Sequence, residues 1–116
     1  MPIPPPLEID VAHVDDTCVI RTEGDLNFAT APALEDALLH ALDSGTASIV
    51  LDLGRVSFID SMGLRVLVWA ANQSREDGDR LRIDCGSGPV RRMMELKSLD
   101  RRLPPIAGRR RTPLPG

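Results

Sequence analysis

The residues best suited to chemistry are Asp60 and Ser61, which lie where an apolar run stops and a helical pattern begins. Asp and Ser are among the best N-cap residues, because their side-chain oxygens accept the free N–H groups of the first helical turn. A hydroxyl at the start of a helix is also within reach of another protein, which can bind or modify it. On local chemistry alone, however, an Asp-Ser pair in this position is most often just a helix cap.

The elements on either side of this pair are predicted to hold it in place. Upstream, residues 48–53 form an apolar run that is typical of a strand buried on both faces. Downstream, apolar residues recur at helical spacing from about Met62 to Asp77, and Gly78 closes the helix. The predicted buried stripe of this helix consists of Leu64, Leu67, Val68 and Ala71. The sequence therefore predicts a strand and a helix that meet at Asp60 and Ser61.

The rest of the chain alternates strands with helices. Residues 7–11 and 17–22 are predicted to form a hairpin, and Gly24 breaks the pattern of the second strand. Thr30 is expected to cap a helix that ends at Gly45. Further elements are expected as a strand at 81–85 and a third helix that begins near Ser87 or Pro89. Strands separated by helices need crossover connections, so we expect an α/β fold with a partly parallel sheet.

The two ends of the chain differ in composition from its middle. Residues 1–6 are rich in proline, and residues 108–116 are rich in arginine and proline. The C-terminal tail is expected to stay disordered, because it offers little apolar surface to offset the entropy of ordering. This leaves one domain over residues 7–107, in which residues 103–107 could supply a last strand. No final amphipathic helix is evident.

Bulk composition excludes several classes of protein. The net charge of −3 gives no reason to expect nucleic-acid binding. No apolar stretch is long enough for membrane insertion, and the N-terminus lacks the pattern of a signal peptide, so we expect a cytoplasmic protein. Cys18 and Cys85 show no metal-ligand spacing and are interpreted as packing residues.

Catalysis is not predicted. Ser61 would act as a nucleophile only with a base to activate it, and the two histidines, His13 and His40, fall in no recognisable motif. The residues around Ser61 do not form the G-x-S-x-G nucleophile elbow. The chain has no P-loop, no dinucleotide-binding glycine pattern and no metal-ligand cluster, so neither a cofactor nor a metal is expected. A small serine hydrolase remains a weak alternative.

Two blocks of sequence, in order, resemble a known family. The later block contains Asp52-Leu53, Val56, Phe58-Ile59-Asp60-Ser61, Gly63-Leu64 and Leu67. The earlier block is Glu23-Gly24-Asp25-Leu26-Asn27-Phe28-Ala29-Thr30-Ala31-Pro32-Ala33-Leu34. Together they resemble the STAS domain of bacterial anti-sigma factor antagonists, and the resemblance covers about residues 7–100.

The resemblance implies both a fold and a mechanism. The fold would be a mixed sheet of four to five strands with helices packed on one face. The unphosphorylated protein would bind an anti-sigma factor of the serine-kinase type and so release a sigma factor. Phosphorylation at Ser61 by that kinase would end the binding, and a separate serine phosphatase would restore it. One departure is Asn27, because the family commonly has Asp at this place.

The candidate partner-binding residues surround the phosphorylation site. They are Asn27, Asp60, Ser61, Met62, Gly63, Arg65 and Trp69. Helical phase places Val66 and Trp69 on a second apolar stripe that begins at Met62, unless other parts of the fold cover them. Asp60 has two open roles, as a cap or as a residue that helps the kinase position the Ser61 hydroxyl. The rival interpretation is a non-switching STAS subunit of a larger cytoplasmic complex or of a lipid transporter.

Overall fold

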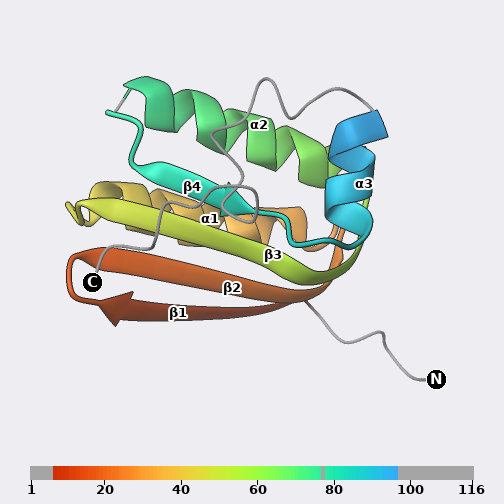
Figure 1. The fold of residues 1–116 in the computed structure, drawn as a ribbon, viewed down its shortest axis with the longest axis horizontal. Coiled ribbons are helices and arrows are strands. Elements are labelled where there is room, and N and C mark those ends of the chain that lie inside the picture. Colours follow the sequence, from red (N-terminus) through yellow and green to blue (C-terminus); the bar gives the residue numbers. More distant parts are fainter. Residues whose placement is uncertain (1–6, 77, 97–116) are drawn as a thin grey trace.

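A computed structural model describes residues 7–76 and 78–96 of the chain (Figure 1). The strands are β1 (Glu8–Val14), β2 (Thr17–Leu26), β3 (Ser48–Ile59) and β4 (Leu81–Asp84). The helices are α1 (Ala31–Asp43), α2 (Ser61–Glu76) and α3 (Pro89–Leu96). The strands form one sheet in the order β1-β2-β3-β4, in which β1 runs antiparallel to β2 and the other pairs are parallel. The predicted α/β fold with a mixed sheet is confirmed.

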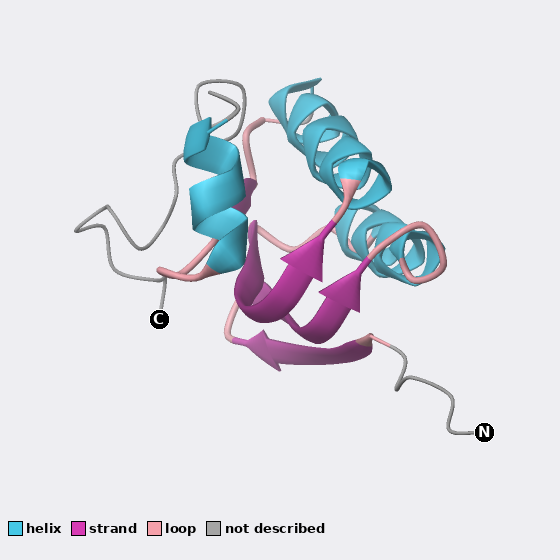
Figure 2. Ribbon diagram, turned by 90° about the vertical axis from the view of Figure 1, so that its right-hand side faces the viewer, coloured by secondary structure: helices cyan, strands magenta, loops and turns pink. Residues whose placement is uncertain are grey.

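The core lies between the sheet and the pair of helices α1 and α2. Figure 2 shows these two helices together on one side of the sheet, while α3 stands apart from them. The strands contribute Cys18, Ile20, Ile49, Leu51, Leu53, Leu81 and Ile83 to this core, and the two helices contribute Leu34, Leu38, Leu67 and Ala71. The third helix packs against β3 and buries Val90 completely.

Both central strands are longer than the sequence pattern predicted. Gly24 does not end β2, which continues to Leu26 with register irregularities between Arg21 and Glu23 and after Gly24. Likewise, β3 continues past residue 53 to Ile59. The added lengths pair with each other in parallel, which satisfies their backbone groups despite the irregular side-chain pattern. As a result β2 and β3 end side by side, with Leu26 opposite Ile59.

The two cysteines are free and buried, and burial raises the pKa of the Cys85 thiol to about 11. Their interpretation as packing residues is confirmed. None of the described helices has the length and apolarity needed to cross a membrane. The predictions for the two termini concern residues 1–6 and 97–116, which lie outside the described residues. They include the limits of the domain and the strand at 103–107.

Candidate functional site

The carboxylate of Asp60 joins two loops that are far apart in sequence. Its Oδ1 accepts the backbone N–H of Gly63 at 2.9 Å, which caps the first turn of α2. Its Oδ2 accepts the backbone N–H of Phe28 at 3.0 Å, in the loop after β2. The Asp60 N–H itself donates to the carbonyl oxygen of Leu26 at 3.1 Å. The cap predicted at this residue is confirmed, and the bond to Phe28 is a second role that sequence reasoning missed.

Gly63 holds the start of α2 close to the end of β2. A Cβ atom at this position would lie 2.8 Å from Leu26 Cγ and 2.9 Å from both the Leu26 carbonyl oxygen and Ile59 Cγ1. These separations are shorter than van der Waals contact, so no larger residue fits unless the backbone moves. Gly63 is itself buried, so its effect on a partner would come from placing Ser61 and Met62.

The turn that carries Phe28 is fixed by side chains of the earlier sequence block. Asn27 Oδ1 accepts the backbone N–H groups of Ala29 at 2.9 Å and Thr30 at 3.2 Å. Thr30 Oγ1 accepts the Asn27 N–H at 2.9 Å and donates to the Asp25 carbonyl oxygen at 2.8 Å. Thr30 is the N-cap residue of α1, as predicted, but the expected capping hydrogen bond from its side chain is absent because the hydroxyl is already used within this turn. Asn27 serves the turn as an acceptor, which needs no negative charge.

Ser61 is exposed at the first position of α2. Within the described part of the chain, no hydrogen bond to its hydroxyl is found. Met62 next to it is 41% exposed, and the guanidinium of the exposed Arg65 lies 4.0 Å from the Met62 sulfur. Phe28, whose backbone is tied to Asp60, is 73% exposed. We call the surface formed by Phe28, Ser61, Met62 and Arg65 the Ser61 surface.

The chain has two phenylalanines, and both are exposed near the end of the sheet that carries Ser61. Phe58 is 49% exposed and pairs in register with Asp25, one step before Leu26 meets Ile59. Exposed aromatic side chains are enriched at protein interfaces. Sequence reasoning treated both residues only as parts of motifs. The sequence signal that could have predicted their exposure is an aromatic residue close to the point where a strand ends and a polar turn begins.

The second apolar stripe predicted along α2 is not an exposed surface. Val66 is 9% exposed and belongs to the core, and the half-buried Trp69 packs against that core. Val68, predicted for the buried stripe, is half-buried. The physical reason is that α2 packs against α1 as well as the sheet, so its apolar arc is wider than one stripe. Of the predicted interface residues on α2, Met62 and Arg65 are exposed beside Ser61.

The two histidines lie at the far end of the sheet from Ser61. His13 on β1 pairs in register with Cys18, and both His13 and His40 line a groove with that residue. Ser61 instead follows the opposite end of β3, so neither imidazole is placed to deprotonate its hydroxyl. Among the described residues, no group of three or more His, Cys, Asp or Glu side chains could hold a metal ion.

A profile of the STAS domain family matches residues 8–110 of this chain, which include both sequence blocks and the Asp60–Ser61 junction. The chain belongs to the STAS domain family. It is 36% identical over 70 residues to a putative anti-sigma factor antagonist, BtrV, of Bordetella bronchiseptica, and the match covers 60% of each protein. It is 27% identical over 101 residues to the anti-sigma-F factor antagonist RsfB of Mycobacterium tuberculosis. That match covers 87% of this chain and 82% of RsfB.

A solved structure of the same class supports the assignment of the fold. The structure of an anti-sigma factor antagonist from Mycobacterium paratuberculosis matches this STAS domain with a TM-score of 0.74 and 28% identity. The superposition covers 90% of this chain and 91% of that one. The resemblance to the STAS family stated from the sequence is therefore confirmed.

Proposed function

We propose that this protein is an anti-sigma factor antagonist that acts by partner switching in the cytoplasm, and that it is a binding protein and not an enzyme. In this proposal the unphosphorylated form binds an anti-sigma factor of the serine-kinase type, which then releases its sigma factor. Phosphorylation of Ser61 by that kinase ends the binding, and a separate serine phosphatase restores it. The names of the similar antagonists support this class of function.

The observation that carries the proposal is the exposed Ser61, which is followed by the exposed Met62 and preceded by Asp60, the residue that holds the backbone of the exposed Phe28. Phe28 and Met62 offer the aromatic and methionine contacts that are enriched at the centres of interfaces. The Asp60 hydrogen bonds hold the backbone of both loops, so a partner need not order them on binding. A serine on such a surface would be buried when the partner binds.

Phosphorylation would then act on binding more than on folding. A phosphate adds about −1.5 to −2 charges, which the free N–H groups and dipole of α2 attract and the Asp60 carboxylate repels. These two local effects oppose each other, so the stability of the domain changes little. A partner that must bury an unpaired dianion, however, pays a large desolvation cost. The switch therefore lies in the interface.

The remaining candidate contacts are ranked by their exposure. Arg65 lies beside Met62 and would meet the partner directly. Asp60, Gly63 and Asn27 would contribute chiefly by holding the two loops. Trp69, which is half-buried, would lie at the margin.

Mapping the phosphate tests the proposal. The protein is incubated with ATP and its cognate kinase-type anti-sigma factor, and the site is located by mass spectrometry. We expect one phosphate on Ser61 and no labelling of Ser61→Ala. The matched control is Ser87→Ala, which removes another exposed serine and should be labelled like the wild type. Labelling of Ser61→Ala at the wild-type level would overturn the proposal.

A non-switching STAS subunit is the second candidate, and Asn27 is the observation that favours it. Where relatives in the family commonly carry an acidic residue, this chain has an amide that serves the turn without charge. A partner could then bind the Ser61 surface without phosphorylating it. Tight binding of the same kinase-type protein with no phosphate transfer would favour this candidate over the switch.

A further inference from the structure

The edge strand β1 has an apolar side that the helices cover only in part. Register partners share one face of a sheet, and Val11 pairs with Ile20. Val11 is 47% exposed, whereas Ile20 is fully buried in the core under the helices. None of the seven residues of β1 is buried. Ile9, on the same side of β1, is half-buried and packs against the core, so the helical layer reaches one end of this strand but leaves Val11 about half exposed.

The uncovered strip forms a groove between β1 and α1. The groove has a volume of about 430 Å³ and is lined by Val11, His13, Cys18, Ala37, His40, Ala41 and Ser44. Its floor is mainly apolar, with one histidine on the strand and one on the helix. Among the described strands β1 pairs with β2 alone, so the backbone groups on its outer side can pair with an added strand.

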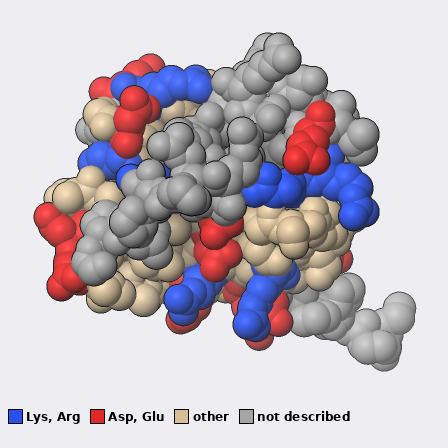
Figure 3. All heavy atoms as spheres, in the orientation of Figure 1, with Lys and Arg blue, Asp and Glu red and all other residues tan. Residues whose placement is uncertain are grey.

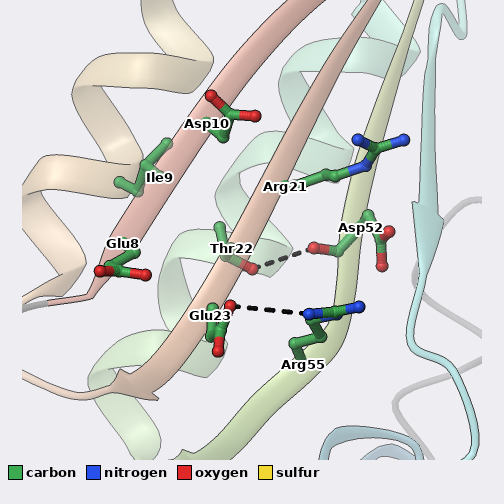
Figure 4. A pocket seen from close by; sticks show the side chains of 8 residues that line it. All are labelled: Glu8, Ile9, Asp10, Arg21, Thr22, Glu23, Asp52 and Arg55. Atoms are coloured by element: carbon green, nitrogen blue, oxygen red, sulfur yellow. Dashed lines mark hydrogen bonds and ion pairs between the residues drawn. The ribbon is translucent and has the colours of Figure 1, made fainter.

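The opposite side of β1 is acidic. Glu8 and Asp10 lie there beside a broad hollow of about 820 Å³, which Figure 4 shows with the charged side chains of β2 and β3. Arg21 lies between Asp10 and Asp52 in the register, and Arg55 forms an ion pair with Glu23 at 3.9 Å. Glu8 has another carboxylate, Glu23, as its register partner.

The negative charge at this edge is therefore not fully compensated. Two arginines and four carboxylates line the hollow. The arginines, Arg21 and Arg55, lie on β2 and β3 and not on β1. The space-filling view shows acidic and basic side chains next to each other on the face seen in Figure 1, with no uniform field of one sign (Figure 3). A strand added outside β1 would meet Glu8 and Asp10 first.

We propose that β1 is a docking edge for an extended segment of a partner protein in which apolar and basic residues alternate. The segment pairs with the outer backbone of β1 and continues the sheet. Its apolar side chains enter the groove beside Val11, and its Lys or Arg side chains lie against Glu8 and Asp10 on the other face.

Charge selects this occupant over a second copy of the chain. Pairing β1 with itself would gather the Glu8 and Asp10 carboxylates of both copies on one face, which disfavours that dimer. The docking edge is also separate from the Ser61 surface, which follows β3 at the end of the sheet. Docking at β1 therefore does not depend on the switching mechanism.

Two synthetic peptides of seven residues test this inference, one alternating Lys with Val and the other alternating Glu with Val. Binding of each fluorescently labelled peptide to the full chain is measured by anisotropy, and amide hydrogen exchange locates the site. We expect the Lys peptide to bind and to slow exchange in β1, and the Glu peptide to bind at least tenfold more weakly. Failure of the Lys peptide to bind, or protection elsewhere than β1, would overturn the proposal.

A charge exchange sharpens the test. Asp10→Lys should weaken the Lys peptide about fivefold to tenfold and strengthen the Glu peptide, as expected for reversing a cross-strand charge pair. Glu76→Lys makes a comparable change of charge at an exposed position on α2 and should leave both affinities within about twofold. Thermal melting confirms that both variants fold. Equal effects of the two substitutions would reduce the binding to general electrostatic attraction and refute the docking edge.

Discussion

The Ser61 surface and the edge strand β1 are both exposed, but they are exposed in different ways. At the Ser61 surface the backbone is held by side-chain hydrogen bonds from Asp60, Asn27 and Thr30, and the tips of apolar side chains reach solvent. At β1 the side chain of Val11 is about half exposed, and no other described strand pairs with the outer side of the backbone. A rigid surface of side chains suits recognition of one partner shape, whereas a free strand edge suits recognition of an extended chain.

The largest contrast should appear between register partners on β1 and β2. Ile20→Ala should lower the free energy of unfolding by about 3 to 4 kcal/mol, because it leaves a cavity in the packed core. Val11→Ala, on the same face one strand away, should cost under about 1 kcal/mol, because this side chain is half in solvent already. Urea denaturation measures both. Similar losses for the two variants would show that Val11 is part of the core.

Gly63→Ala should be the next largest effect. The added Cβ would lie 2.8 Å from Leu26 Cγ and 2.9 Å from a backbone oxygen, so we expect a loss of about 2 kcal/mol from overpacking. The matched variant is Gly88→Ala, where no atom lies within 4 Å of the new Cβ and stability should not fall. The readout is the shift in melting temperature of each variant. If Gly63→Ala melts like the wild type, the close approach of α2 to β2 is relaxed easily.

Two variants of Asp60 separate the contributions of the two hydrogen bonds that its carboxylate accepts. Asp60→Ala removes both hydrogen bonds and should cost about 2 kcal/mol. Asp60→Asn keeps one side-chain carbonyl oxygen for the Gly63 N–H but cannot accept the Phe28 N–H as well, so it should cost about half as much. Chemical denaturation gives the energies, and amide exchange at Phe28 reports the lost loop contact. If amide exchange at Phe28 is as slow in both variants as in the wild type, Asp60 does not bridge the two loops.

The smallest effects on stability should come from the Ser61 surface itself. Ser61→Asp and Phe28→Ala change exposed side chains and should alter the free energy of unfolding by less than about 0.5 kcal/mol. Both should nevertheless weaken binding to the kinase-type partner by tenfold or more, measured by calorimetry. Leu39→Ala, which truncates an exposed apolar residue on α1, is the control and should bind normally. A large fall in the melting temperature of Ser61→Asp would instead assign the residue a structural role.

Much of this arrangement could be predicted from sequence, because local signals carry it. The Asp60 cap, the start of α2 and the order of strands and helices all follow from side-chain chemistry and periodicity within short windows. The extension of β3 to Ile59 could not be predicted in this way, because its partner strand supplies the reason. Burial of Val66 depends on α2 contacting both the sheet and α1.

The same limit applies to the candidate site. The use of the Thr30 hydroxyl within the Asn27 turn, in place of a capping hydrogen bond, depends on a competition between two local hydrogen-bonding patterns that the sequence alone does not decide. The bond from Asp60 to Phe28 joins residues 32 positions apart, so no local pattern encodes it. The individual residues of the site could thus be predicted from the sequence, but the hydrogen bonds that join them could not.

The 32-residue span of that bond sets the order of events during synthesis of the chain. Phe28 leaves the ribosome early, together with β2, and stays without its acceptor until α1, β3 and Asp60 have been translated. The parallel pairing of β2 with β3 must then close before Phe28 and Ser61 come together. A nascent or unfolded chain therefore contains Ser61 but lacks the Ser61 surface. A partner that binds this surface recognises only the folded protein.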